Sequence, residues 1–468
     1  MGKNLSLIDE TICAICTTLG PGSVSIIRIS GPESFNIVRK LFIPTGKKNF
    51  NDLEDRKMYL GQFVSNDKLI DEAICVLFRS PNSLTGQDVV EIHTHGGTMV
   101  PQMVMSSLLS KGARISEPGE FSFRAYQNGK IDLLKAEGVA SLIASQTEAA
   151  VLNSTINISG DVRNKFNNIR DLGINLLAEI EARVDFPEDE IPEVEQAKID
   201  GFFYNVIKAC DLILNRYSKG RLVINGLRVL ILGEPNAGKS TLLNAILSED
   251  KAIVSSKPGT TRDILEADIL YNGRRMVFSD TAGIRLTDEE VEIEGIKRAK
   301  DKVDYSDVVI ILTDFNANWK EMNKAFDFVP RGKRLFVGNK IDLSDDLKEI
   351  EKIIKLEEKS LEIEKISLIS AKENIGVEKL LEDIALFCKE DMEVDFEEGI
   401  LTSDRQANLL KDALKSLNKG REGFCSGKPF EIISIDIREF LDLIGKITGE
   451  VTNEDVYDAL FSKFCIGK

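Results

Sequence analysis

The pattern of apolar and polar residues divides the chain into three zones. Up to about residue 122, short runs of strand type such as VSIIRIS, AICVLF and DVVEIHTH alternate with helical stretches such as ESFNIVRKLF. Alternation with a period of two is typical of a half-buried strand, whereas apolar residues at every third or fourth position indicate a helix. The first zone therefore predicts a small α/β domain.

From residue 123 the pattern becomes helical and contains hardly any run of strand type. An apolar stripe with helical spacing consists of Phe166, Ile169, Leu172, Leu176, Ile180 and Val184. Pro187 and Pro192 follow this stripe, and we expect the helix to end before them because proline cannot continue a helix. A further helical stretch runs on to about residue 219.

The third zone is α/β again, and the chain then returns to a helical pattern. The simplest organisation is a multidomain α/β plus all-α protein, in which an inserted α/β domain splits a helical domain in sequence. We place the N-terminal α/β domain at 1–122, the two helical parts at 123–222 and 385–468, and the inserted domain at 223–384.

The strongest chemical signal opens the inserted domain, in LRVLILGEPNAGKSTLLNAIL. A strand precedes the loop GxxxxGKS and a helix follows it, which is the context that makes this motif specific for phosphate binding. The loop amides carry partial positive charge, Lys239 reaches the β- and γ-phosphates, and the Ser240 hydroxyl suits Mg²⁺. We assign nucleotide binding to Asn236, Ala237, Gly238, Lys239, Ser240 and Thr241.

Further motifs follow in the order of a Ras-like G domain and predict a GTPase. VFSDTAG places Asp280 at a strand end, where it can hold Mg²⁺ through water, and PGTTRD supplies Thr261 as a second Mg²⁺ hydroxyl. Asp342 can accept hydrogen bonds from the guanine N1–H and amino groups, a donor pair that adenine lacks. The GTP-binding set thus gains Thr261, Asp280, Thr281, Ala282, Gly283, Asn339, Lys340, Ile341, Asp342, Ser370, Ala371 and Lys372.

One residue differs from the one that Ras-like GTPases have at the same position of the motif. Ras-like proteins orient the attacking water with a Gln after the DxxG glycine, whereas this chain has Ile284 there. Another carboxylate or amide must orient the water, and Glu292 is our candidate. Asn236 offers a neutral oxygen that suits a monovalent cation beside the β- and γ-phosphates; the alternative is that Asn236 only fixes the turn of the loop.

Composition and charge limit the classes of protein to which this chain can belong. The net charge of −16 disfavours nonspecific nucleic-acid binding over the whole surface, although it leaves room for a local basic patch. No apolar run approaches the ~18–20 residues of a membrane span, and the start lacks the pattern of a secretory signal. The seven cysteines are an odd number, which disfavours a disulfide framework and favours the cytoplasm.

Two pairs of residues in the first zone have spacings that deserve an interpretation. Cys13 and Cys16 form a CxxC, but without a second such pair we favour strand residues over a zinc or redox site. His93 and His95 lie on one face of a strand, so a metal pair is one alternative. With only two histidines in the chain, we favour strand packing or a substrate contact.

The chain ends in FCIGK, with Cys465 at the fourth position from the end. This is the position of a prenylated cysteine, but Gly467 and the terminal Lys468 fit that motif poorly. A functional thiol and a buried packing thiol are two further interpretations of Cys465.

Together these motifs resemble one family over the whole chain. DTICAICTTLGPGSVSIIRISG, NSLTGQDVVEIHTHGG, EPGEFSFRAYQNGKIDL and the final FCIGK resemble signatures of the tRNA-modification GTPases called MnmE or TrmE, which act on the wobble uridine. The GTPase motifs alone are shared with many proteins, whereas their combination with the tail is close to diagnostic. The opening departs from the family at Ser25, where glycine is usual, with Pro21 beside it, and this could crowd the loop.

The resemblance implies a folate site in the N-terminal domain. In the family this domain forms a homodimer and binds a formyl- or methylene-tetrahydrofolate, and the matching positions are Arg28, Glu91, Lys130 and Lys468. The family's tail folds back toward this site and its cysteine is needed for modification. Cys465 is therefore expected to act there as a nucleophile or an acid.

The resemblance also implies potassium-activated GTP hydrolysis. The family's G domains pair across a K⁺ ion, and the residues that would surround it here are Asn236, Ser255, Lys257 and Thr260. Ser255 and Thr260 thereby join the GTP-binding set, and the family's catalytic carboxylate falls on Glu292. The family works with a flavin-containing partner subunit, MnmG or GidA, which holds FAD and forms a heterotetramer that acts on tRNA without a membrane.

A second functional class remains open. The alternative is a GTP-dependent ribosome-assembly switch without modification chemistry, although such proteins lack the N-terminal domain and the FCIGK tail. Binding of tRNA by an acidic chain requires a local patch. Its candidates are Lys411, Lys415, Lys419 and Arg421, which fit a solvated helix face equally well.

Overall fold

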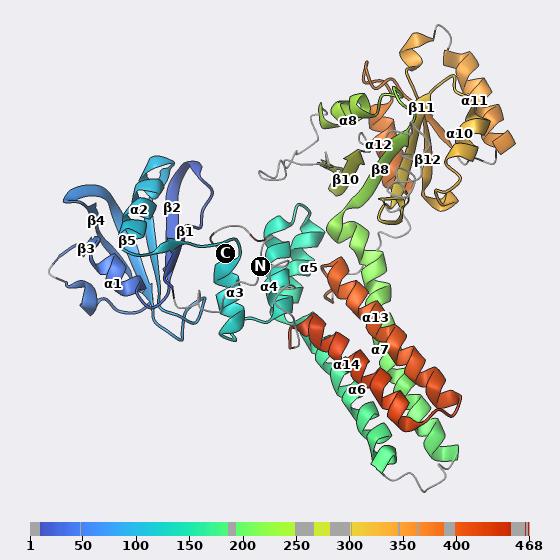
Figure 1. The fold of residues 1–468 in the computed structure, drawn as a ribbon. Coiled ribbons are helices and arrows are strands. Elements are labelled where there is room, and N and C mark those ends of the chain that lie inside the picture. Colours follow the sequence, from blue (N-terminus) through green and yellow to red (C-terminus); the bar gives the residue numbers. More distant parts are fainter. Residues whose placement is uncertain are drawn as a thin grey trace, which may run out of the picture. The chain divides into compact units, whose positions relative to one another are not determined.

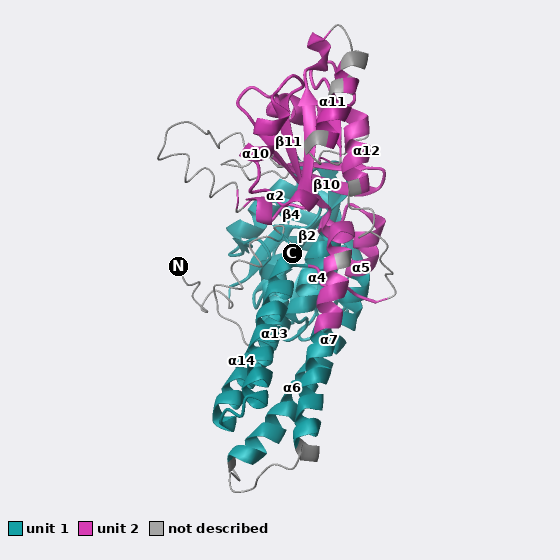
Figure 2. Ribbon diagram, turned by 90° about the vertical axis from the view of Figure 1, so that its right-hand side faces the viewer, with its two compact units in different colours: residues 1–143, 155–210, 403–468 teal, residues 144–154, 211–402 magenta. Residues whose placement is uncertain are grey.

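The computed structural model describes most of the chain and divides it into two compact units. Described are residues 10–46, 48–185, 193–248, 266–280, 300, 302–344, 347–361, 363, 365–387, 398–450, 464 and 467. Unit 1 comprises residues 1–143, 155–210 and 403–468, and unit 2 comprises residues 144–154 and 211–402 (Figure 2).

A seven-stranded sheet forms the N-terminal part of unit 1 (Figure 1). In sheet order the strands are β3 (Phe42–Pro44), β4 (Met58–Ser65), β5 (Lys68–Phe78), β6 (Val89–Gly97), β2 (Gly20–Ser30), β1 (Ile12–Ile15) and β7 (Arg114–Ile115). β1 and β7 pair in parallel, and the other ladders are antiparallel. Helices α1 (Ser34–Arg39) and α2 (Met99–Ser110) contribute to the core on one face of this sheet.

The period-two alternation of the strands separates core residues from site residues. On β6, Val90 and Ile92 are buried in the core, whereas Glu91 and His93 point to the opposite face and are only partly buried. The same alternation that builds the core therefore leaves a row of polar side chains on the other face.

The rest of the described part of unit 1 is mainly helical. They are α3 (Glu120–Gln127), α4 (Leu133–Ala144), α5 (Glu148–Ser159), which begins in unit 2, α6 (Asp161–Asp185), the first part of α7 (Glu193–Asn225), α13 (Asp404–Cys425) and α14 (Phe430–Thr448). The predicted stripe on α6 is confirmed as a packing face, because Phe166, Ile169, Leu176 and Ile180 are buried. α14 packs against both α6 and α13 (Figure 1), so helices from before and after residues 211–402 share one core.

A six-stranded sheet forms the centre of unit 2. In sheet order the strands are β13 (Ile366–Leu368), β12 (Arg334–Asn339), β11 (Val308–Asp314), β8 (Leu227–Gly233), β10 (Arg274–Asp280) and β9 (Glu266–Tyr271). All neighbours are parallel except β10 and β9, which form a hairpin. Helices α8 (Lys239–Ser248) and α12 (Val377–Phe387) cover one face, and α10 (Trp319–Ala325) and α11 (Leu347–Leu361) cover the other.

The architecture confirms the predicted fold class, a multidomain protein of α/β and helical parts. Within the described ranges, no helix combines the length and the apolar character needed to cross a bilayer.

Candidate functional site

The glycine-rich loop joins β8 to α8. β8 ends at Gly233 and α8 begins at Lys239. A Cβ atom at Gly233 would overlap the Leu312 carbonyl oxygen of β11, and one at Gly238 would overlap the Asn339 side chain. Close packing inside the protein thus requires glycine at both positions. This requirement adds to the one that the motif predicts, namely that the backbone can come close to a phosphate.

The side chains of the loop are arranged for a phosphate group. Lys239 Nζ donates to the carbonyl oxygens of Gly233 and Glu234, each at 2.9 Å, so its ammonium group lies over the loop. Ser240, one residue into α8, is exposed and can present its hydroxyl to a cation. Asn236 has a φ of 65°, a left-handed conformation that Asn tolerates, so both alternatives for its role remain.

Asn339 connects three loops of the nucleotide site. Its Nδ2 atom donates to the Ala237 carbonyl oxygen at 2.8 Å, and its Oδ1 atom accepts from the Ala371 amide at 2.9 Å. The side chain is buried. One amide group therefore holds together the glycine-rich loop, the loop of residues 339–342 and the loop of residues 370–372, a role that the motif alone does not indicate.

The carboxylate predicted to bind guanine is held in place by a neighbouring loop. Ser370 Oγ donates to Asp342 Oδ1 at 2.6 Å, and Asp342 is exposed. Lys340 has a φ of 68° and lies 3.2 Å from Asp314 Oδ2 at the end of β11. The structure thus brings Asp342, Ser370 and Ala371 to the same edge of the sheet as the glycine-rich loop.

Several predicted residues of the nucleotide site lie outside the described residues. They are Ser255, Lys257, Thr260, Thr261, Thr281, Ala282, Gly283 and Glu292. Asp280 is described as the last residue of β10, where its register partner is Ile231 of β8. The K⁺ ligands and the catalytic carboxylate therefore stay predictions.

In the N-terminal sheet, Arg28 of β2 and Glu91 of β6 are register partners. Arg28 Nε and Nη2 lie 2.9 and 2.8 Å from Glu91 Oε1, and His93 Nε2 lies 3.5 Å from Glu91 Oε2. The hydrogen bond from His93 and the positive charge of Arg28 lower the pKa of Glu91, against the opposing effect of burial. A carboxylate held from both sides is thus ionised and fixed in orientation.

The C-terminal tail meets this pair. The Gly467 carbonyl oxygen accepts from Cys16 Sγ at 3.3 Å and from Arg28 Nη1 at 3.4 Å. Phe464 is buried beside Leu133 of α4. Phe464 and Gly467 are both buried. Their burial disfavours the prenylation of Cys465, because a lipid-modified end has to leave the protein surface. Cys465 and Lys468 lie outside the described residues.

Helix α3 positions two of the predicted folate residues. The Phe121 ring lies under the Arg28 guanidinium, with 5.7 Å between the guanidinium carbon and the ring centroid. Lys130 follows the other end of the helix, and its amide donates to the Ala125 carbonyl oxygen at 2.8 Å. Asn128 Nδ2 holds this turn to the Thr85 carbonyl oxygen at 2.6 Å.

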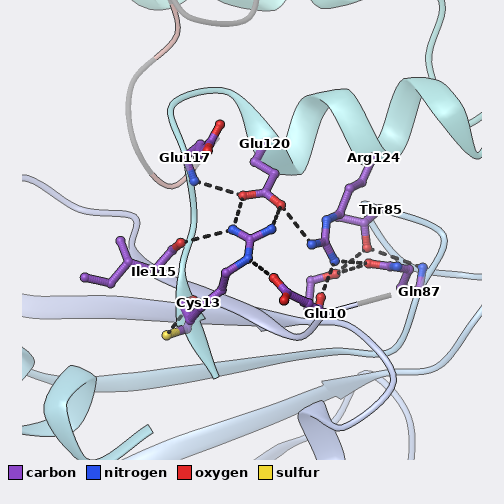
Figure 3. Close-up of polar contacts among 10 residues, drawn as sticks. Glu10, Cys13, Thr85, Gln87, Ile115, Glu117, Glu120 and Arg124 are labelled. Carbon is purple, nitrogen blue, oxygen red and sulfur yellow. Dashed lines mark hydrogen bonds and ion pairs between the residues drawn. The ribbon is translucent and has the colours of Figure 1, made fainter. Parts of the chain in front are cut away.

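A polar network that the sequence analysis missed anchors α3 (Figure 3). Arg124 is 1% exposed and donates to the Glu10 carbonyl oxygen, to Gln87 Oε1 and to Glu120 Oε1 at 2.8, 3.0 and 2.8 Å. Arg114 of β7 also donates to Glu120. The spacing of Glu120 and Arg124 by four residues on a helix was the available signal for part of this network.

The remaining candidates of the first zone have ordinary partners. Burial raises the pKa of the Cys13 thiol to about 12, as expected for a packing cysteine. His95 Nδ1 lies 2.8 Å from Asp71 Oδ1, and the described residues include no cluster that could hold a metal. Ser25 is buried and its Oγ atom lies 2.8 Å from Thr17 Oγ1, so the sheet accommodates this departure from the family.

The basic residues proposed for tRNA are mostly paired with acids. Lys415 contacts Asp412 at 2.9 Å, Lys419 contacts Asp436 at 2.5 Å, and Arg421 contacts Asp200 at 2.7 Å. This pairing favours the alternative that the four residues belong to a solvated helix face.

The strand, the glycine-rich loop, the helix and the fixed Asp342 define a P-loop GTP-binding protein. Known protein families agree with this assignment. Residues 11–130 match the family described as "GTP-binding protein TrmE N-terminus", and residues 133–465 match the family described as "MnmE helical domain". Proteins described as tRNA modification GTPase MnmE from Carboxydothermus hydrogenoformans and Acetivibrio thermocellus are 35% and 38% identical. These matches cover 99% and 98% of this chain and 100% and 99% of the relatives.

The chain therefore belongs to the MnmE (TrmE) family of tRNA modification GTPases, and it is a GTP hydrolase that takes part in tRNA modification. A solved structure of Era from Aquifex aeolicus bound to GDP and AlF4⁻ matches 40% of this chain and 66% of its own, at 26% identity. Its TM-score of 0.29 is too low to add to this assignment.

Proposed function

We propose that this chain hydrolyses GTP with the help of a K⁺ ion and uses the GTP cycle to modify the wobble uridine of tRNA. It works as a homodimer in the cytoplasm with a flavin-containing partner subunit and a tetrahydrofolate one-carbon donor. The observation that carries the proposal is the contact of the C-terminal tail with the Arg28–Glu91 pair. This contact gives the chain a second polar site besides the nucleotide site.

The Arg28–Glu91 pair suits the polar edge of a pterin ring. Because Glu91 neutralises Arg28, the pair offers a ligand both hydrogen-bond donors and acceptors and no large net charge. A pterin edge carries amide and amino donors beside acceptor nitrogens, which complements such a pair. Lys130 is exposed, and its charge suits the carboxylates of a glutamyl tail, together with Lys468.

We assign the chemistry on this ligand to the thiol of Cys465. Cys465 precedes Gly467 by two residues, and two residues span at most about 7 Å. Gly467, which is two residues further on, contacts Arg28, and this contact supports the assignment of Cys465 to the folate site. The roles open to it are those of a nucleophile and of a proton donor.

For the nucleotide site we propose the metal ligands that the motifs predict. Hydroxyl, carboxylate and carbonyl oxygens are the ligands that Mg²⁺ prefers, and the exposed Ser240 hydroxyl fits this requirement. When bound, Mg²⁺ and K⁺ neutralise the negative charge that develops on the phosphates. Mg²⁺ is assigned to Ser240 and Thr261, K⁺ to Asn236, Ser255, Lys257 and Thr260, and orientation of the attacking water to Glu292.

The rate of GTP hydrolysis in KCl and in NaCl of equal ionic strength tests the proposal. We expect the rate in KCl to be at least about tenfold higher, which corresponds to ~1.4 kcal/mol of transition-state stabilisation. Asn236→Ala is expected to reduce this difference, while Asn272→Ala, in the β9–β10 turn, is a control on the same domain. Equal rates in the two salts would remove K⁺ from the mechanism.

A further inference from the structure

The β9–β10 hairpin lies in the sequence between two segments that are predicted to contact the γ-phosphate and Mg²⁺. Thr261 precedes β9 by five residues, and β10 ends at Asp280, the first residue of the DTAG motif. In GTPases such segments are ordered by the γ-phosphate and released on hydrolysis. The hairpin is therefore the regular element that is covalently joined to both segments.

Neighbouring arginines at the start of β10 make different contacts, because successive side chains of a strand face opposite sides of the sheet. Arg274 Nη1 donates to the Ala385 carbonyl oxygen of α12, which covers one face of the same six-stranded sheet, at 2.9 Å. Arg275 Nη1 instead donates to the Asn225 carbonyl oxygen at the end of α7, at 3.3 Å, and Nη2 lies 2.6 Å from Asp268 Oδ2. Arg275 thus ties both strands of the hairpin to α7.

The backbone that leaves α7 packs directly against Arg275. Gly226, between α7 and β8, has a φ of 84°. A Cβ atom there would lie 2.8 Å from the Arg275 carbonyl oxygen and 2.9 Å from Arg275 Cγ. A shift of Arg275 along the strand therefore has to be met by a shift at the end of α7.

A second contact holds the same end of α7 to a different strand. Arg221 pairs with Asp307, which directly precedes β11, and Asp307 Oδ2 also accepts from the Arg228 amide at 2.9 Å. Arg221 and Asn225 are four residues apart, about one helical turn. Movement of the hairpin relative to β11 therefore acts on the last turn of α7, a single helix of 33 residues.

From these contacts we propose that the Arg275–Asp268 pair couples the nucleotide state of the G domain to helix α7. Asp268 fixes the guanidinium of Arg275, and the guanidinium fixes the Asn225 carbonyl group. Both are positioning residues, and neither belongs to the nucleotide site. The proposal depends on GTP hydrolysis, which family membership gives, and is independent of the K⁺ and folate proposals.

Amide hydrogen exchange of residues 218–225 tests the coupling in the full-length protein. In the wild type, we expect exchange rates to differ by at least about threefold between the GDP-bound state and the state bound to a non-hydrolysable GTP analogue. In Arg275→Ala we expect this difference to be lost, while the rate of GTP hydrolysis stays within about twofold of the wild type. Asp268→Asn is expected to lose at least about half of the difference.

Arg274→Ala is the matched control, because the neighbouring arginine contacts α12, and it should keep the full difference. Arg275 lines a cavity of about 520 Å³ with Leu222 and Leu270, so its truncation enlarges an existing space. If Arg275→Ala does not fold, Arg275→Lys and Asp268→Asn carry the test. The proposal is overturned if the wild type shows no difference, if Arg275→Ala and Asp268→Asn both retain it, or if Arg274→Ala loses it equally.

Discussion

Single side chains set the geometry of both candidate sites. The amide group of Asn339 holds three loops together around the nucleotide site. Glu91 accepts from Arg28 on one oxygen and faces His93 with the other. In each case a buried or half-buried polar group with partners on both sides fixes the position of its neighbours, which prepares a site before a ligand arrives.

Replacing Asp342 by Asn tests the guanine assignment. Asp342→Asn removes the charged acceptor for two guanine donors, and hydrogen bonds to a charged group contribute about 1.5–3 kcal/mol each. We expect GTP affinity, measured with a fluorescent analogue, to fall by about a hundredfold. Ser370→Ala, which frees the carboxylate and also removes the hydrogen bond that Ser370 Oγ accepts from the Glu373 amide, is expected to cost about tenfold or less. If ATP binds the wild type as tightly as GTP, the assignment is wrong.

The lowered pKa of Glu91 predicts a pH-dependent contribution to stability. Its carboxyl has an ordinary pKa of 4.5, and the folded value is lower because of His93 and Arg28. The unfolded chain therefore takes up the proton at higher pH, so the stabilisation is complete above about pH 4.5 and is lost as the pH falls through the folded pKa. Urea unfolding should show that the wild type loses more free energy than Glu91→Gln between about pH 6 and pH 3. Equal losses would show that Glu91 is not held by these partners.

At the scale of elements, short helices and turns position residues that are distant in sequence. α3 supports Arg28 through Phe121 at one end and leads to Lys130 at the other. The network around Arg124 joins this helix to β7 and to the segment at Gln87. α6 and α14 approach closely at Gly173, where a Cβ atom would lie 2.8 Å from the Phe440 ring.

Two glycine-to-alanine changes test this close approach. Gly201 in α7 has open space around its Cα atom, so Gly201→Ala should raise the free energy of unfolding by about 0.5–1 kcal/mol through helix propensity. Gly173→Ala gains the same propensity but presses on the buried Phe440 ring, and overpacking costs about 1–3 kcal/mol. Denaturant unfolding followed by circular dichroism should place Gly173→Ala below Gly201→Ala. The packing of α6 on α14 would be contradicted by equal stabilisation.

The sequence was sufficient for elements whose burial repeats at a fixed spacing. The stripe from Phe166 to Ile180 on α6 and the alternation on β6 could be predicted because one face of each element is buried. The glycine-rich loop could be predicted because the spacing of its glycines, lysine and serine is what allows the backbone to wrap around a phosphate. The contacts of Arg124 with Glu10 and Gln87 could not, since no periodicity encodes hydrogen bonds between polar groups far apart in sequence.

At the scale of the whole molecule, the C-terminal tail contacts the N-terminal sheet. Gly467 lies against Arg28 and Cys16, so a residue of the C-terminal tail completes the polar site of the N-terminal sheet. The basic residues of α13 are largely neutralised by acids, which fits a chain of net charge −16. If the proposed flavin-containing partner subunit takes part in tRNA binding, we expect it to supply much of the positive charge that this binding requires.

The most direct measurement is nucleoside analysis of tRNA from a strain that lacks this protein. The account predicts that the modified wobble uridine disappears, that the wild-type gene restores it, and that Cys465→Ser, which keeps the GTPase domain intact, does not. Normal levels of the modified nucleoside in the deletion strain would contradict the account. Full restoration by Cys465→Ser would remove the tail thiol from the chemistry and favour a GTP-dependent switch.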